Sequence, residues 1–146
     1  MTTAAVKGYG IELKVGANPA AVTATVVMGG LTDIPPPSFT RESIDVTAHD
    51  STDGYREFLG GLKDPGELTM TLNWTPGNAT HDVAIAMMDE DLPRLFVVTF
   101  TQVTPNVLCT YRAVMLGFEP TGAVEGQLTA SVSLRVSGKP VWSDAP

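Results

Sequence analysis

The segment ESIDVTAHDSTDGYREFLGGLKDPGE, residues 42–67, is the part of the chain that composition and periodicity explain least. It has the period of neither a strand nor a long helix, and four glycines and one proline interrupt it. Long irregular segments are uncommon inside compact domains and are usually functional or disordered. Disorder requires low hydrophobicity, whereas this segment carries six large apolar side chains: Ile44, Val46, Tyr55, Phe58, Leu59 and Leu62. We therefore expect a functional loop at about 40–66.

Part of this loop has helical spacing. Tyr55, Phe58, Leu59 and Leu62 are separated by three and four residues, which places side chains on one face of a helix. The glycine pair at 60 and 61 favours a helix end. We expect one or two helical turns between residues 55 and 62.

The loop also holds more than half of the excess charge. Residues 41–67 contain seven carboxylates and three bases, a net charge of −4, whereas the whole chain of 146 residues carries −7. The nine Lys and Arg residues are scattered and form no patch along the sequence. Because duplex binding depends on basic side chains that neutralise phosphates, these charges argue against a protein that grips nucleic acid. DNA is expected to slide past this protein rather than to be held by it.

The loop contains an ordered series of short motifs. The pattern runs through Ile44-Asp45-Val46-Thr47, Asp50-Ser51, Gly54-Tyr55-Arg56-Glu57-Phe58-Leu59, Gly61-Leu62-Lys63-Asp64 and Gly66-Glu67, and leads into an alternating strand. It resembles the tail tube (major tail) proteins of long-tailed bacteriophages. Ser137-Gly138-Lys139-Pro140 agrees with the same family more loosely.

The resemblance implies a structural subunit. Such proteins assemble as rings of six that stack into a hollow conduit for DNA, in which each subunit supplies part of a continuous inner β-barrel. Stacking contacts are then expected from the long loop, from an N-terminal arm at about 1–8 and from a C-terminal extension at about 138–146. The candidate ring-stacking residues are Ile44, Asp45, Val46, Thr47, Asp50, Tyr55, Arg56, Phe58, Leu62 and Lys63.

The same resemblance implies the partners and the location. The partners are further copies of the chain, tail tip or baseplate proteins, a tail terminator and a tape measure protein inside the tube. We expect assembly in the host cytoplasm and a final place in the virion, without membrane insertion. The longest apolar runs are far shorter than the roughly 20 residues that a membrane span needs, and no N-terminal export signal is visible.

The remainder of the chain has the patterns of a β-rich protein. We expect strands at 11–15, 21–28, 67–75, 95–103, 107–118 and 127–136, and a short helix at about 80–90 with Thr80 as its N-cap. Residues 138–146 are expected to be irregular, with Trp142 docking onto this domain or a neighbour. The predicted fold is a single, mainly β domain over 1–146: a β-sandwich or partly closed barrel with one short α-helix and the long early loop.

Two predicted strands have a small polar face. Thr69, Thr71 and Asn73 alternate with apolar residues on one strand, and Thr129, Ser131 and Ser133 do so on another. These six residues are candidates for the tube lining, because a DNA conduit must not bind phosphate. An ordinary solvated sheet face explains the alternation equally well. Arg135 continues one of these faces and departs from a neutral wall, so we expect it to be paired or to lie in an interface.

Catalytic and metal-binding motifs are not apparent. His49 lies near Asp45, Asp50 and Asp53 in sequence, but the spacing matches no known metal motif, so we expect no bound metal or cofactor. His81 is expected at the surface, and Cys109, inside an apolar run, is expected to be buried. The sequence contains no P-loop and no G-x-S-x-G, and nothing in it supports an enzyme.

Two other functions remain open. A ligand-binding or carbohydrate-binding β-sandwich is one, although it would require exposed aromatic side chains on one face. The tube protein of a contractile injection device or of a gene transfer agent is the other, and sequence patterns do not separate it from a phage tail tube.

Overall fold

The computed structural model describes residues 10–122, 124 and 126–144, and within them the chain forms nine strands, one α-helix and two short 3-10 helices. The expected N-terminal arm at about 1–8 lies outside the described residues. Seven strands form one sheet: β1 (Glu12–Gly16), β2 (Ala24–Val27), β3 (Leu31–Asp33), β6 (Glu67–Asn73), β7 (Arg94–Phe100), β8 (Val107–Gly122) and β9 (Leu128–Asp144). The other two, β4 (Thr40–Asp45) and β5 (Phe58–Asp64), pair with each other. The helices are α1 (Ala79–Ala86), η1 (Thr52–Gly54) and η2 (Met87–Asp89).

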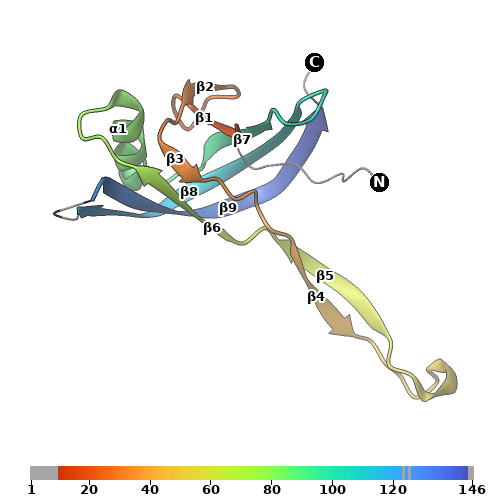
Figure 1. The fold of residues 1–146 in the computed structure, drawn as a ribbon. Coiled ribbons are helices and arrows are strands. Elements are labelled where there is room, and N and C mark those ends of the chain that lie inside the picture. Colours follow the sequence, from red (N-terminus) through yellow and green to blue (C-terminus); the bar gives the residue numbers. More distant parts are fainter. Residues whose placement is uncertain (1–9, 123, 125, 145–146) are drawn as a thin grey trace.

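The large sheet is antiparallel and curled. Its strand order is β2-β1-β7-β8-β9-β6-β3, so the consecutive strands β2 and β3 lie at opposite edges. The short connection between them is hydrogen-bonded to both sides: Met28 N–H donates to the Leu13 carbonyl (3.0 Å), and Asn73 N–H donates to the Gly30 carbonyl (2.7 Å). The sheet therefore wraps around its concave face without closing into a barrel, with α1 and β3 near that face (Figure 1). The predicted mainly β fold with one short helix is confirmed.

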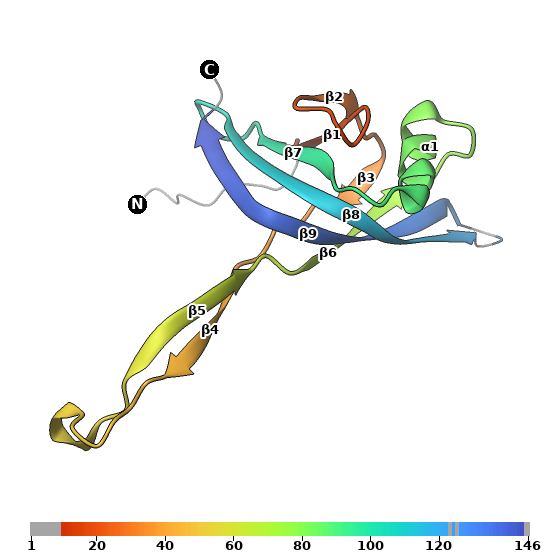
Figure 2. The same cartoon turned by 180° about the vertical axis from the view of Figure 1, so that it is seen from behind.

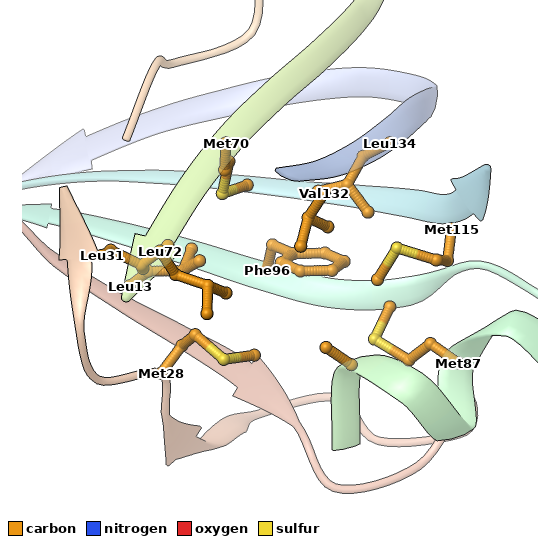
Figure 3. A pocket seen from close by; sticks show the side chains of 11 residues that line it. Leu13, Met28, Leu31, Met70, Leu72, Met87, Phe96, Met115, Val132 and Leu134 are labelled. Carbon is orange, nitrogen blue, oxygen red and sulfur yellow. The ribbon is translucent and has the colours of Figure 1, made fainter. Parts of the chain in front are cut away.

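The concave face holds the hydrophobic core. Side chains alternate in β6, where Leu68, Met70 and Leu72 are buried, and in β9, where Ala130, Val132, Leu134 and Val136 are buried. This is the period of two that predicted both strands. Figure 3 shows a cavity within the core, lined by methionine, leucine and other apolar side chains from several strands and from the helical segment. Its volume of about 10 Å³ is at most that of one water molecule, so it has no room for a ligand.

The helix begins slightly earlier than predicted. Asn78 is the N-cap, and its side-chain oxygen accepts hydrogen bonds from Thr80 N–H (3.0 Å) and from the Thr80 hydroxyl (2.7 Å). Thr80, the expected cap, is therefore already inside the helix. The last predicted turn forms the 3-10 helix η2, and the buried Met87 belongs to it.

His81 is buried, which corrects the prediction of a surface residue. Only 2% of His81 is exposed. Its Nδ1 accepts a hydrogen bond from Thr75 N–H (3.1 Å), and its Nε2 lies 2.8 Å from the Gly29 carbonyl, so the tautomer with its proton on Nε2 satisfies both partners. The imidazole thus ties α1 to the end of β6 and to the β2–β3 connection. Sequence reasoning placed this residue correctly at the helix start but could not identify these distant backbone partners.

Replacing His81 with alanine should destabilise the fold. The variant loses the packing of the buried imidazole and two part-buried hydrogen bonds, to the Thr75 N–H and the Gly29 carbonyl, each worth about 0.5–1.5 kcal/mol. We expect a loss of that order in the free energy of unfolding, measured by chemical denaturation. His49→Ala is the matched control, because His49 is exposed and surface changes usually stay within about 0.5 kcal/mol. Equal effects of the two substitutions would contradict the bridging role of His81.

The last strand continues much further than predicted. We expected the strand at 127–136 to end before an irregular tail, but β9 runs from Leu128 to Asp144. Pairing with β8 shifts register between Thr110 and Arg112, opposite the segment around residues 138–140, and then resumes to pair Val107 with Asp144. Gly138, at φ +83°, accommodates this irregularity, so the glycine and proline signals mark a bulge and not an end. The expected docking of Trp142 is confirmed onto this domain, because its ring stacks on Phe100 at 5.7 Å.

Candidate assembly interface

Residues 40–64 form a projecting hairpin, here called the arm. The antiparallel strands β4 and β5 pair Thr40 with Asp64 and Asp45 with Phe58, and the arm extends away from the curled sheet (Figures 1 and 2). The predicted helical turns at residues 55–62 are wrong, because residues 58–64 form a strand. In a strand, the neighbours Phe58 and Leu59 lie on opposite faces, and an irregularity in the pairing between Gly60 and Lys63 interrupts the alternation before Leu62. Apolar residues on both faces produced a spacing that resembled a helix.

Glycine at positions 60 and 61 is explained by close contact with Arg41 and not by the end of a helix. A Cβ atom at Gly60 would lie 2.3 Å from the guanidinium carbon of Arg41. Arg41 Nε also donates a hydrogen bond to the Gly61 carbonyl (3.1 Å). The absence of a side chain at Gly60 therefore lets Arg41 lie across β5, with its guanidinium over Gly60.

The tip of the arm, residues 46–57, is ordered by local polar contacts. The Ser51 hydroxyl donates to Glu57 Oε2 (2.7 Å) and accepts from Ala48 N–H (2.9 Å), while Glu57 N–H donates to the Thr47 hydroxyl (2.8 Å). Thr47 N–H donates to Asp45 Oδ1 (2.9 Å). The hydrogen bonds from the side chain and backbone of Thr47 hold the pKa of Asp45 below its ordinary value. The tip thus keeps a defined shape without a core of its own.

All ten candidate ring-stacking residues lie on this arm and are exposed. Leu62 is 90% exposed, Tyr55 74% and Phe58 54%. Gathering so many large apolar side chains on one exposed segment is unusual for a monomer and marks an interaction surface.

An ion-pair cluster attaches the arm to the sheet. Arg135 Nη2 lies 2.9 and 3.1 Å from the two carboxylate oxygens of Asp64, and Arg135 Nη1 lies 4.0 Å from Glu67. Gly66 N–H also donates to Asp64 (2.8 Å). The expectation that Arg135 is paired is confirmed. The Gly66 N–H, and after it Arg135, hold the pKa of Asp64 below its ordinary value of 3.8.

Removing Arg135 should shift this titration only in part. In Arg135→Ala the pKa of Asp64 should rise towards 3.8 without reaching it, because the larger contribution, from Gly66 N–H, remains. A carboxyl group whose pKa is lowered by folding stabilises the folded state at pH values above its ordinary pKa. This stabilisation is lost as the pH falls through the folded-state pKa. A carboxyl ¹³C NMR titration of both proteins measures the shift. An unchanged pKa would show that Arg135 does not act on Asp64, and a complete return to 3.8 would show that Gly66 does not.

The polar residues of β6 and β9 meet on the convex side of the sheet. Cross-strand pairing places Thr69 beside Ser133, Thr71 beside Ser131 and Asn73 beside Thr129. These six residues, here called the polar face, are exposed or partly exposed. No other described element covers the convex side of β6, β8 and β9 (Figures 1 and 2). The two candidate sets therefore form one contiguous surface.

The described residues contain little that suits chemistry. No group of three or more His, Cys, Asp or Glu side chains within them is arranged to hold a metal ion, and His49 is exposed. Cys109 is fully buried, as predicted, and burial raises the pKa of its thiol to about 11, which leaves little nucleophilic thiolate near neutral pH. Among the described helices, none has the length and hydropathy needed to cross a membrane.

Comparisons with solved structures identify the fold. A chain in the tail of an empty gene transfer agent particle, refined with C6 symmetry, is 18% identical with a TM-score of 0.74, covering 95% of this chain and 99% of that one. A chain of the sheath–tube complex of an extracellular contractile injection system, PVC, is 10% identical with a TM-score of 0.70, covering 97% and 93%. The SPP1 tail tube structure is 16% identical with a TM-score of 0.64, covering 97% and 80%.

Sequence comparison identifies the family. No curated protein sequence matches the chain. A family model described as lambda phage tail tube protein, TTP, matches residues 9–143, which is nearly the whole chain and includes the complete arm. The chain therefore belongs to the lambda phage tail tube protein family, and it is a structural subunit of a tail tube.

Proposed function

We propose that six copies of this chain form a ring and that the rings stack through the arm into a hollow conduit for DNA. The observation that carries the proposal is the projecting hairpin with its exposed apolar side chains. A monomer gains nothing from exposing Leu62 and Tyr55 to water, whereas an adjacent ring can bury them. The C6 symmetry of the gene transfer agent tail and the sixfold symmetry of an anti-feeding prophage baseplate support the ring size.

The ring-stacking contact is assigned to the ten exposed residues of the arm. Its apolar part consists of Ile44, Val46, Tyr55, Phe58 and Leu62, and its polar part of Asp45, Thr47, Asp50, Arg56 and Lys63. In the single domain that we propose, the segments at about 1–8 and 138–146 add contacts to the same neighbours. Of these, residues 138–144 lie in β9, and Gly138, Lys139 and Pro140 lie beside Lys63 and Asp64 at the base of the arm.

The tube lining is assigned to the polar face. Its six side chains are hydroxyls and one amide, without a lysine or arginine among them: Thr69, Thr71, Asn73, Thr129, Ser131 and Ser133. A wall without cations lets a polyanion pass without being held, because affinity for DNA depends mainly on phosphate neutralisation. The role is structural and requires no catalytic residue, metal or cofactor.

Further partners follow from a place in a tail. One similar structure is described as a sheath/tube terminator and another as part of a baseplate. We therefore assign a terminator protein to one end of the tube and a tip or baseplate to the other. A tape measure protein in the lumen is part of the same proposal and follows from the family resemblance alone. Assembly in the host cytoplasm and incorporation into the virion belong to the same proposal.

The kind of particle is the remaining alternative. The similar folds come from a phage tail tube, a gene transfer agent tail and a contractile injection system.

A carbohydrate-binding module fits the structure less well. Among the described residues, the exposed aromatic side chains are Phe39 next to the arm, Tyr55 and Phe58 on the arm, and Trp142 at a distant strand end, so they do not form one platform.

Electron microscopy tests the proposed assembly. Purified protein at high concentration should form hollow tubes or rings of regular width in negative stain, with sixfold symmetry in end views. Light scattering on the same sample should show growth with concentration. A monomer at every concentration, including in the presence of preformed tail tips as nuclei, would overturn the proposal and favour a binding module.

A further inference from the structure

Four of the nine basic residues of the chain gather where the arm joins the sheet, although they are far apart in sequence. Arg41, Lys63 and Arg135 line a groove of about 580 Å³. Lys63 and Lys139 line an adjoining groove of about 350 Å³, and the two share Asp64, Pro65 and Gly138. We call this combined surface the basal groove. The bases are scattered along the sequence, but the fold brings these four together.

The charges of the basal groove are only partly compensated. Arg41 and Lys63 occupy directly opposite positions of the β4–β5 ladder, where like charges are destabilising. Asp64 is already bound to Arg135. Neither Lys63 nor Lys139 forms an ion pair with any of the described residues. An incoming carboxylate would relieve this repulsion.

The tip of the arm has the opposite charge. Between residues 45 and 57 the chain carries four carboxylates and one arginine. Asp45 and Glu57 accept hydrogen bonds within the arm. Asp50 and Asp53 are exposed, and no ion pair occupies them within the described part of the chain. The 3-10 turn of η1, with Asp53 at a φ of 57°, presents this part of the loop at the far end of the arm (Figure 1).

The tip cannot reach the groove of its own subunit. The six residue steps from Phe58 to Asp64 span about 20 Å at roughly 3.4 Å per residue in a strand, and the tip lies beyond Phe58 (Figure 2). Nucleic acid fits the groove poorly, because the four bases are interleaved with Glu42 and Asp64, whereas nucleic-acid binding needs a continuous row of Lys and Arg that neutralises many phosphates. A second copy of this chain supplies an acidic, exposed and pre-shaped occupant.

We propose that the basal groove of one subunit receives the acidic tip of a subunit in the adjacent ring, with Lys63 and Lys139 facing Asp50 and Asp53. This inference rests on the proposed stacking through the arm and names the surface that accepts it. Tip and groove are different surfaces of one chain, so the contact is heterologous and repeats along an axis instead of closing into a dimer. Such a contact gives the stack a direction and propagates it ring by ring.

Charge reversal in two matched variants tests the pairing. One variant, Lys63→Glu with Lys139→Glu, has an acidic groove, and the other, Asp50→Lys with Asp53→Lys, has a basic tip. All four residues are exposed, so both variants should keep the thermal unfolding midpoint of the parent. Alone, each should lose sedimentable tubes by at least roughly tenfold, because like charges are then brought together at the interface. Mixed in equal amounts they should assemble, since the groove of each accepts the tip of the other.

The outcomes separate this inference from the proposed function. Recovery of tubes in the mixture, and in a variant that combines all four substitutions, is the expected result. Normal assembly of each variant alone, or a mixture that stays unassembled, would overturn the pairing. If in addition Phe58→Lys abolishes tubes, the arm still stacks rings but docks on another surface. If Phe58→Lys also assembles, the stacking role of the arm fails as well.

Discussion

Phe58→Asp is expected to give a folded subunit that no longer forms tubes. Phe58 is 54% exposed at the outer end of β5, so aspartate there meets water in the free subunit. When the arm packs against an adjacent ring, this carboxylate would lose its hydration without gaining a hydrogen-bond or ion-pair partner, which is strongly unfavourable. Sedimentation and negative-stain microscopy measure the loss of tubes. Circular dichroism and the thermal midpoint check that the subunit remains folded.

Two further variants sharpen this test. Phe58 pairs with Asp45 across the ladder, so aspartate at 58 would also place like charges opposite each other. Phe58→Lys avoids this like-charge pair, because lysine is attracted to Asp45. It should abolish tubes to the same extent. Val22→Asp is the matched control for an added charge, since Val22 is 82% exposed in the β1–β2 connection, outside the arm. Intact tubes from Phe58→Lys would contradict the assignment of ring stacking to the arm.

The largest effect on stability is expected from Leu134→Ala. Leu134 is fully buried in β9, faces the concave side and lines the small core cavity (Figure 3). Truncating a buried leucine costs about 2–5 kcal/mol, because transfer energy is lost and the cavity grows. In a domain of this size that corresponds to a fall of roughly 5–15 °C in the thermal midpoint. Denaturant titration and calorimetry measure both quantities.

Leu128→Ala is the matched control on the same strand. Leu128 is 42% exposed near the start of β9, so the loss of its side chain removes less apolar surface from a buried environment. Its backbone carbonyl, which accepts from Trp74 N–H (2.9 Å), is unaffected. Equal destabilisation by the two substitutions would contradict a core centred on the concave face.

The sequence predicts the sheet well where one face is buried. In β6 and β9 every second residue is apolar, so the period of two identifies both the strand and its core-facing side. The same alternation identified the six residues of the polar face. Their cross-strand contacts became visible only with the register between Thr69 and Ser133.

The arm escaped prediction because neither of its faces is buried. Without a core, β5 has no alternation, and its strand character comes from pairing with residues more than a dozen positions earlier in the chain. The position of the Arg41 side chain over Gly60 depends on the same pairing of β4 with β5. Family resemblance, in contrast, singled out this segment as the candidate interface, and its motif residues coincide with the arm.

Long-range contacts explain the other corrections. His81 is buried by backbone groups at Gly29 and Thr75, and β9 passes Gly138 and Pro140 because β8 continues to pair with it on the far side of a bulge. The basal groove combines residues 41, 63, 135 and 139, which only the junction of the arm with β9 brings together. Local sequence patterns contain no information on such contacts.

Amide hydrogen exchange in subunits and in assembled tubes tests the central claim most directly. In the free subunit, the tip at residues 46–57 is exposed and its amide hydrogen bonds are local to the arm, so they should open readily and its amides should exchange rapidly. If the arm stacks rings, residues 46–57 should become strongly protected in tubes, together with residues 135–139 beside the basal groove. Rapid exchange of the tip in intact tubes, with protection confined to the edges of the large sheet, would contradict the account.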